Sequence, residues 1–418
     1  MRERHSLTLP AAVSHRFSPY TDCDSRITDF QGIGMNEQIL FIRLLIEKHL
    51  QYNKPMVACF IEYHKDGKRI PWSRMISILL RKRVSEETMR VIQKLARKGS
   101  VFGRDKRLKH FWFKREKGAK LSQIMSKSIF DTYAIDRLIR VLKTWDGGVD
   151  IFGCIIKIIR YATETTLFAA NEEKLATLLE RIEEVTIDSG VRINRNTTKI
   201  MVVDRLKVLK KSDKLGDYER VNEIIYLGSL ISNKGTCTQE IDRRIYMASC
   251  VLSLIENQWK MRTNASTEEK KELVINVVFP VLRYASETWT LKSTDRKKID
   301  RFEMKCWRKV LDIRRPCSAS NISIRKKLKI STKQSTWCQL KAIGFFGHIV
   351  CEPTRALTHA LLLAHLRNPN GNRGRGRPPQ GWDSAVKKTI GCHDIRVAIR
   401  QAHDRKRWSQ LSHGEHIT

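Results

Sequence analysis

Three arginines alternate with glycine near the carboxyl end of the chain, at Arg373, Arg375 and Arg377. A tryptophan, Trp382, follows them. Guanidinium groups contact phosphate oxygens in nucleic-acid complexes, and an indole ring offers a face on which a base can stack. The surrounding segment 368–379 is rich in glycine and proline, which is typical of a linker or loop. We therefore expect these residues to contact nucleic acid, and a nonspecific basic linker is the alternative.

A second basic segment, residues 98–120, carries aromatic side chains as well. Its basic and aromatic members include Phe102, Arg104, Lys106, Arg107, Lys109, Phe111, Trp112, Lys114 and Arg115. Such interleaving suits phosphate contact together with base stacking. It equally suits a solvated hairpin whose aromatic rings enter a core, so the sequence leaves both interpretations open.

Cys338, His348 and Cys351 are side chains of the kinds that bind zinc. Their spacing matches no compact zinc finger, and a fourth ligand such as His359 would have to be chosen freely. We therefore expect ordinary side chains here and no zinc site.

The elements that could position a site are clearest between residues 56 and 203. The run 56–61 is continuously apolar, which predicts a buried strand, and Glu62 stands at its carboxyl end. Residues 155–169 predict an apolar hairpin whose turn reads Tyr161-Ala162-Thr163-Glu164. A helix from Asn171 and a short strand pair through Lys199 are expected after it.

The segment IIRYATETTLFAANEEKLATLLERIEEVTIDSGVRINRNTTKIMVV resembles the palm of non-LTR (LINE- or RTE-type) retrotransposon reverse transcriptases. NEQILFIRLLIEKHLQYNKP resembles the late fingers region, YLGSLIS the primer-grip hairpin, and EIDRRIYMASCVLSLIENQWKMR the thumb. RGRGRPPQGW is similar to an element near the carboxyl end. These matches follow the family's order over roughly residues 31–411. The family's endonuclease and the first part of its fingers precede this region, so we expect a truncated element that begins after both.

The resemblance implies RNA-directed DNA polymerase chemistry with two Mg²⁺ ions, whose ligands would fall at Glu62, Thr163 and Glu164. The family's turn reads Tyr-Ala-Asp-Asp, so a neutral hydroxyl replaces one aspartate here. The two glutamates are one methylene longer, and carboxylate shifts of about 1 Å can cost about 100-fold in rate. We therefore expect the metal and the polymerase activity to have been lost.

The implied nucleotide pocket departs from the family as well. The aromatic residue that checks the incoming sugar falls at Gly67, and Ser122 replaces a glycine that follows Gly118. Lys199 falls where the family has a basic residue near the incoming phosphates. A side chain at Ser122 would crowd the approach of a nucleotide.

The expected fold is an α/β (α+β) reverse-transcriptase-like palm with partial fingers, followed by a mainly helical thumb and carboxyl-terminal region. The predicted divisions are a leader over 1–34, partial fingers and palm over 35–235, a helical thumb over 236–330, and a basic region over 331–418. A last helix is expected at about residues 397–408.

The 79 Lys and Arg residues exceed the 44 Asp and Glu residues, which gives a formal net charge of +35. Basic charge recurs along the whole chain, so we expect RNA or DNA as a partner, bound without sequence preference. No signal peptide or apolar span is evident, which favours a nuclear or cytoplasmic protein. Two alternatives stay open: weak polymerase activity with metal at Glu62 and Glu164, and a co-opted protein-interaction scaffold.

Overall fold

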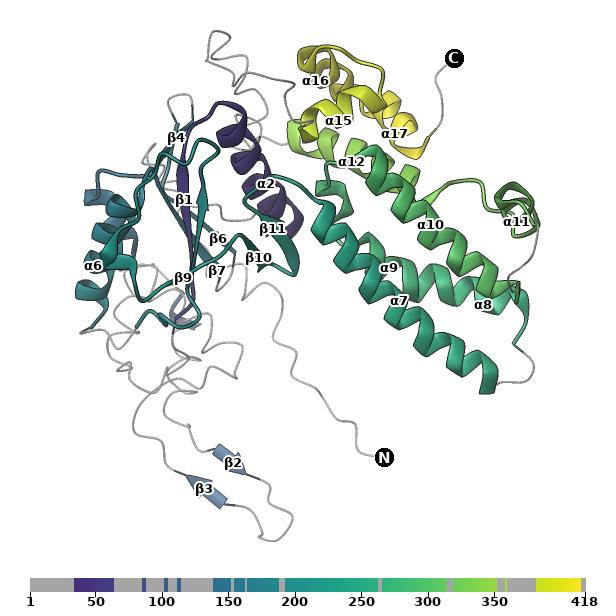
Figure 1. The fold of residues 1–418 in the computed structure, drawn as a ribbon, viewed down its shortest axis with the longest axis horizontal. Coiled ribbons are helices and arrows are strands. Elements are labelled where there is room, and N and C mark those ends of the chain that lie inside the picture. The colour runs from purple at the N-terminus through teal and green to yellow at the C-terminus, as the bar shows by residue number, and fades with distance from the viewer. Residues whose placement is uncertain are drawn as a thin grey trace. The chain divides into compact units, whose positions relative to one another are not determined.

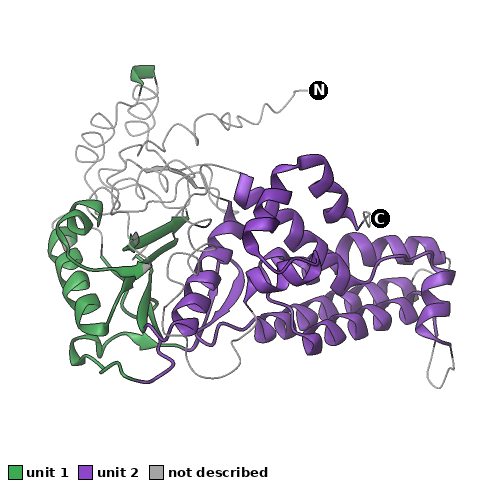
Figure 2. Ribbon diagram, turned by 90° about the horizontal axis from the view of Figure 1, so that it is seen from above, with its two compact units in different colours: residues 1–32, 55–202, 208–221 green, residues 33–54, 203–207, 222–418 purple. Residues whose placement is uncertain are grey.

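A computed structural model describes residues 34–63, 85–87, 101–103, 111–113, 138–151, 154–161, 164–187, 192–261, 265–313, 319–351, 358 and 381–414. The chain divides into two compact units (Figure 2). Unit 1 comprises residues 1–32, 55–202 and 208–221, and unit 2 comprises residues 33–54, 203–207 and 222–418.

Unit 1 is built on a five-stranded sheet with the strand order β6-β7-β1-β8-β9 (Figure 1). The strands are β1 (Met56–Ile61), β6 (Ile158–Tyr161), β7 (Glu164–Ala169), β8 (Lys199–Val203) and β9 (Glu219–Arg220). β7 is antiparallel to both β1 and β6, and β8 is parallel to β9. All six residues of β1 are buried, which explains why its sequence is continuously apolar instead of alternating.

The helix α6 (Glu172–Ile187) packs against β1 and β7. The side chain of Asn171 accepts a hydrogen bond from the backbone N–H of Lys174 at 2.8 Å, so it caps the helix as its residue type favours. Four helix residues at helical spacing enter the core of the sheet: Leu175, Leu178, Leu179 and Ile182. The predicted strand, hairpin strands and following helix are confirmed.

Two short antiparallel ladders accompany this sheet. One joins β2 (Val101–Gly103) to β3 (Phe111–Phe113), and the other joins β4 (Val149–Ile151) to β5 (Cys154–Ile156). The basic and aromatic segment 98–120 thus contains a strand pair. The side chains of that segment lie outside the described part of the chain, so both interpretations of it stay predictions.

Unit 2 begins with α2 (Met35–Gln51), which packs beside the hairpin of β10 (Glu223–Tyr226) and β11 (Ser229–Ser232). The two-residue turn Leu227-Gly228 has φ angles of 46° and 76°, the left-handed geometry that suits a tight hairpin. Arg43 of α2 donates to the backbone oxygen of Leu230 at 3.0 Å, and Glu240 accepts from the N–H of Leu230 at 2.9 Å. Two buried side chains therefore close the outer edge of β11.

Most of the other described residues of unit 2 are helical (Figure 1). Its elements are α7 (Thr238–Met261), α8 (Thr267–Leu273), a π-helical turn (Val274–Val278), α9 (Phe279–Arg283), a 3-10 turn (Ser286–Thr288), α10 (Ser293–Val310), α11 (Asn321–Lys327), α12 (Gln334–Cys351), α15 (Trp382–Thr389), α16 (Ile395–His403) and α17 (Arg405–His413). Residues of α7, α9, α10, α11 and α12 share one apolar core. The expectation that residues 236–330 are mainly helical is confirmed in the described residues of this range.

The predicted single helix at about residues 397–408 is wrong. Asp404 ends α16 and begins α17, because its carboxylate accepts a hydrogen bond from the backbone N–H of Arg407 at 3.1 Å. An aspartate that caps a new helix interrupts the old one.

The predicted divisions after residues 34, 235 and 330 stay predictions. The helix α2 and the hairpin β10–β11 belong to unit 2, since Arg43 also donates to the Ser229 hydroxyl at 3.0 Å and to the Cys237 sulfur at 2.9 Å. In the described part of the chain, no helix has the length and apolar character needed to cross a membrane.

Candidate nucleic-acid interface

Two of the three implied metal ligands, Glu62 and Glu164, lie at neighbouring strand ends in unit 1. Ile61 of β1 pairs with Thr165 of β7, so the same register continued by one residue sets Glu62 opposite Glu164. Opposite residues of an antiparallel pair have Cα atoms about 4.5–5.5 Å apart. Both glutamates are exposed. The backbone of Glu62 is held by Asn194, whose N–H donates to its carbonyl at 2.8 Å.

This donor set does not fit a two-ion polymerase site. Such a site holds two ions about 3.5–4 Å apart and requires carboxylates in strict octahedral positions around Mg²⁺. Here the turn contributes one carboxylate, Glu164, because residue 163 is a threonine. Among the described residues, no group of three His, Cys, Asp or Glu side chains could hold a metal ion.

The structure describes only one of the remaining positions that the resemblance assigned to the nucleotide pocket. Lys199, at the start of β8, forms an ion pair with Glu219 of β9 at 3.1 Å, and its side chain is 35% exposed. Its charge is therefore partly neutralised within unit 1. Thr163, Gly67, Gly118 and Ser122 lie outside the described residues, as do the tail arginines Arg373, Arg375 and Arg377.

The stacking role predicted for Trp382 is wrong for this structure, because its side chain is completely buried. The indole N–H donates to the carbonyl of Glu287 at 2.8 Å, and the backbone N–H of Trp382 donates to Glu47 at 3.0 Å. A ring enclosed in this way packs the helical core and has no free face for a base.

The zinc candidates Cys338, His348 and Cys351 all belong to α12. Thirteen residues separate the two cysteines, which corresponds to about 20 Å along a helix, so these two cannot share one ion. Burial raises the pKa of the Cys338 thiol to about 12, which keeps it protonated and a poor metal ligand. His359 lies outside the described residues.

A basic groove in unit 2 is the feature with the clearest chemistry. It is open, has a volume of about 1580 Å³, and is lined by residues of α7, α10 and α11 and of the segments that follow α10 and α11. Among the described residues, its charged lining consists of the basic residues Lys297, Lys298, Arg301, Lys305, Arg308, Lys309, Arg325 and Lys333 and the acidic residues Asp242 and Asp300. Eight cations against two carboxylates make this groove attractive to a polyanion.

The helix α10 arranges these cations in a stripe. Lys297, Arg301 and Lys305 are spaced by four residues and are all exposed, so they lie on one side of the helix. The opposite side supplies buried packing residues, among them Ile299, Phe302, Cys306 and Val310. One helical turn is 5.4 Å, so the stripe presents roughly one positive charge per turn.

Other cations of the groove are already neutralised by protein carboxylates. Lys298 pairs with Asp242 at 2.7 Å, Arg325 with Glu303 at 3.2 Å, and Lys309 with Glu256. Within the described part of the chain, Lys297, Arg301 and Lys305 have no ion-pair partner. Arg308 and Lys333 of the lining also have no ion-pair partner there. These five side chains therefore carry the charge of the groove that is available to phosphates.

The described lining residues of the groove offer no ring on which a base could stack. Among them, Phe302 is the one aromatic side chain and is 4% exposed. Cations without exposed rings favour contact with the phosphate backbone over contact with bases. Such a lining fits binding without sequence preference.

Sequence reasoning did not single out this groove. Helical spacing of Lys297, Arg301 and Lys305 was present in the sequence, and a search for basic stripes at four-residue intervals would have found it. The neutralised cations could not have been recognised, because their partners come from distant segments.

No protein-family model matches the chain. A protein of Caenorhabditis elegans described as a putative uncharacterized transposon-derived protein is 24% identical over 264 residues, which is 60% of this chain and 92% of that protein. Apo telomerase from Candida tropicalis has a TM-score of 0.41 and 9% identity, with 94% of this chain and 59% of that chain covered. Telomerase from Candida albicans, in complex with a fragment of telomeric RNA, has a TM-score of 0.34, 10% identity, and coverage of 88% and 56%. The chain is thus similar in sequence to a protein named as transposon-derived.

Proposed function

We propose that the chain is a retrotransposon-derived, reverse-transcriptase-like protein that binds nucleic acid through the basic groove and does not polymerise. The observation that carries the binding proposal is the exposed stripe Lys297, Arg301 and Lys305, whose charges no described carboxylate neutralises. The transposon-derived name of the C. elegans relative supports the proposed origin. The proposed type of element, a non-LTR one, rests on the motifs of the sequence.

The proposed loss of polymerase activity is supported by the donor set. Glu62 and Glu164 face each other across β1 and β7, and the residue between Ala162 and Glu164 contributes no carboxylate. A weakly active enzyme with metal on these two glutamates is the second candidate, and their juxtaposition is the observation that favours it.

Binding is tested with a triple variant, Lys297→Gln, Arg301→Gln and Lys305→Gln. A control variant removes three exposed lysines from another segment, Lys207, Lys210 and Lys211, also by change to Gln. Both variants lose the same net charge, so only the position of the charge differs. Affinity for a short duplex is measured by fluorescence anisotropy at several salt concentrations.

Each phosphate contact contributes about 0.9 to the slope of log affinity against log salt on duplex DNA. The groove variant should therefore lose roughly 2 to 3 units of slope, and the control variant should keep the slope of the natural chain. Equal slopes for both variants would reject the groove as the binding surface. Affinity that does not change with salt would favour a protein partner, as the scaffold alternative requires.

A further inference from the structure

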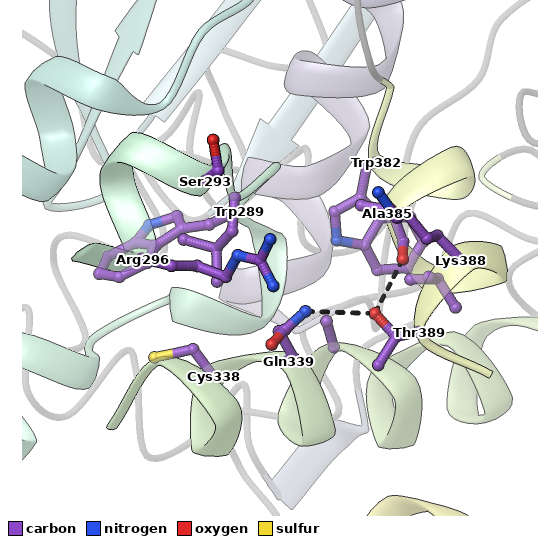
Figure 3. Close-up of a pocket in the computed structure, with 12 residues that line it drawn as sticks. Trp289, Ser293, Arg296, Cys338, Gln339, Trp382, Ala385, Lys388 and Thr389 are labelled. Atoms are coloured by element: carbon purple, nitrogen blue, oxygen red, sulfur yellow. Dashed lines mark hydrogen bonds between the residues drawn. The ribbon is translucent and has the colours of Figure 1, made fainter. Parts of the chain in front are cut away.

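A second, smaller cavity of unit 2 lies between α10, α12 and α15 (Figure 3). Its volume is about 350 Å³, and its polar lining residues include Ser293, Arg296, Gln339, Lys388 and Thr389. Arg296 is the residue before Lys297 on α10. Two neighbouring cations of one helix thus line two different cavities.

The deep walls of this cavity are closed to solvent. Trp289 is 2% exposed, and both Trp382 and Cys338 are completely buried. These three side chains therefore offer almost no accessible apolar surface to a ligand. The surface left to a ligand is therefore the polar rim, which favours a small polar group.

The rim is cationic. Arg296 and Lys388 both line it, and none of the described lining residues is acidic. Within the described part of the chain, neither cation has an ion-pair partner. Figure 3 shows the guanidinium of Arg296 directed toward the side of the cavity where Gln339 and Thr389 meet.

Hydrogen bonds fix the remaining polar side chains of the rim. The amide of Gln339 donates to the hydroxyl of Thr389 at 3.3 Å, and that hydroxyl donates to the carbonyl of Ala385 at 2.9 Å. The rim thus offers a guanidinium group from Arg296, an ammonium group from Lys388 and the amide of Gln339. Guanidinium and ammonium groups form charge-assisted hydrogen bonds with phosphate oxygens.

We propose that this cavity is a phosphate subsite, in which Arg296 and Lys388 hold one phosphate of a nucleic acid bound along the adjacent groove. The subsite rests on the proposed binding function, because the bound strand would have to extend past Lys297. The phosphate has two possible sources with the same chemistry: one inside the backbone, or one at the 5′ end of a strand.

The test compares two double variants that remove equal charge from the same two helical regions. The cavity variant is Arg296→Gln with Lys388→Gln. The control is Lys292→Gln with Lys387→Gln, whose residues do not line the cavity. Two duplexes of one sequence serve as probes, one with and one without 5′-phosphates, and the melting temperature of each protein is recorded.

The cavity variant should bind about tenfold more weakly than the control, as expected for loss of charge-assisted contacts. An equal loss on both duplexes, with a salt slope lower by about 1, identifies a backbone phosphate. A loss confined to the 5′-phosphorylated duplex identifies a terminal phosphate. Either result supports the subsite.

Equal affinities of the cavity variant and the control variant on both duplexes would overturn the subsite. The proposed function is separately tested by the groove variant. If that variant weakens binding while the cavity variant does not, the groove stands and the subsite falls. If neither weakens binding, both fall.

Discussion

The carboxylate of Glu303 on α10 binds the guanidinium of Arg325 on α11 at 3.2 Å, and Glu303 is completely buried. The same carboxylate accepts hydrogen bonds from the indole N–H of Trp307 at 3.0 Å and from the backbone N–H of Gln334 at 2.8 Å. Gln334 is the first residue of α12. The buried carboxylate of Glu303 therefore connects α10 with α11 and α12. The contact holds Arg325, a residue that lines the groove.

We predict that Glu303→Ala destabilises unit 2 by about 3 kcal/mol, because removal of one member of a buried pair leaves the other charge and its hydrogen-bond donors without a partner. The comparison is Glu256→Ala, which breaks the more exposed pair with Lys309 and should cost less than about 1 kcal/mol. Thermal unfolding measures both. Similar costs for the two variants would contradict the greater contribution expected of the buried Glu303.

A glycine on α12 provides a second prediction. A Cβ at Gly347 would lie 2.3 Å from the indole nitrogen of Trp408, whereas a Cβ at Gly344 would lie 3.6 Å from its nearest neighbour, Ser412. Trp408 is buried and donates to the carbonyl of Ile343 at 2.9 Å. Gly347→Ala should therefore destabilise the packing of α17 by about 1–3 kcal/mol.

The matched change Gly344→Ala should be neutral or stabilise the helix by up to about 1 kcal/mol, since alanine favours helix. The two variants are compared by melting temperature and by limited proteolysis near the carboxyl end. An unchanged melting temperature in Gly347→Ala would contradict the close packing of Trp408 against Gly347.

The pH dependence of unit 2 should involve Glu47 of α2. Burial raises the pKa of this carboxyl to about 7, although hydrogen bonds from Trp382 and Thr290 act in the opposite direction. The usual value is 4.5, so the folded state binds a proton more tightly than the unfolded state. The associated stability is present below about pH 4.5 and is lost as pH rises through about 7.

The variant Glu47→Gln lacks this titration. Relative to the variant, the natural chain should lose on the order of 2 kcal/mol between pH 5 and pH 8, or roughly 4–8 °C in melting temperature for a unit of this size. Melting curves at four pH values check this. Parallel pH profiles for the two proteins would mean that Glu47 does not titrate in this range.

Much of the local structure could be predicted from the sequence. The apolar run of β1 and the helical spacing of Leu175 to Ile182 gave correct elements, because periodicity reports burial directly. Trp382 could not be placed in this way. Its burial depends on Glu47 and Glu287, which are distant in the chain, and a tryptophan beside arginines suggests a binding surface equally well.

Only part of the groove could be predicted from the sequence. The stripe on α10 follows from helical spacing, but which cations stay free depends on Asp242, Glu256 and Glu303, whose positions arise from packing. The resemblance assigned Glu62 and Glu164 to the same implied metal site. The register of β1 with β7, continued by one residue, sets the two glutamates opposite each other.

Polymerase activity is predicted to be absent. Purified protein with an RNA template, a DNA primer, nucleotides and Mg²⁺ or Mn²⁺ should extend the primer no more than a heat-inactivated control. Restoration of aspartates at Glu62, Thr163 and Glu164 should recover little, because Gly67 and Ser122 still alter the implied nucleotide pocket. Extension by the natural chain that disappears in Glu62→Gln would establish the enzyme alternative.

The most direct test of the account is lysine acetylation followed by mass spectrometry, with and without a saturating duplex. The account predicts that bound nucleic acid protects Lys297 and Lys305 from acetylation and leaves the exposed Lys207, Lys210 and Lys211 as reactive as before. Unchanged reactivity of Lys297 and Lys305 in the saturated complex would contradict the proposal that the groove binds the phosphate backbone.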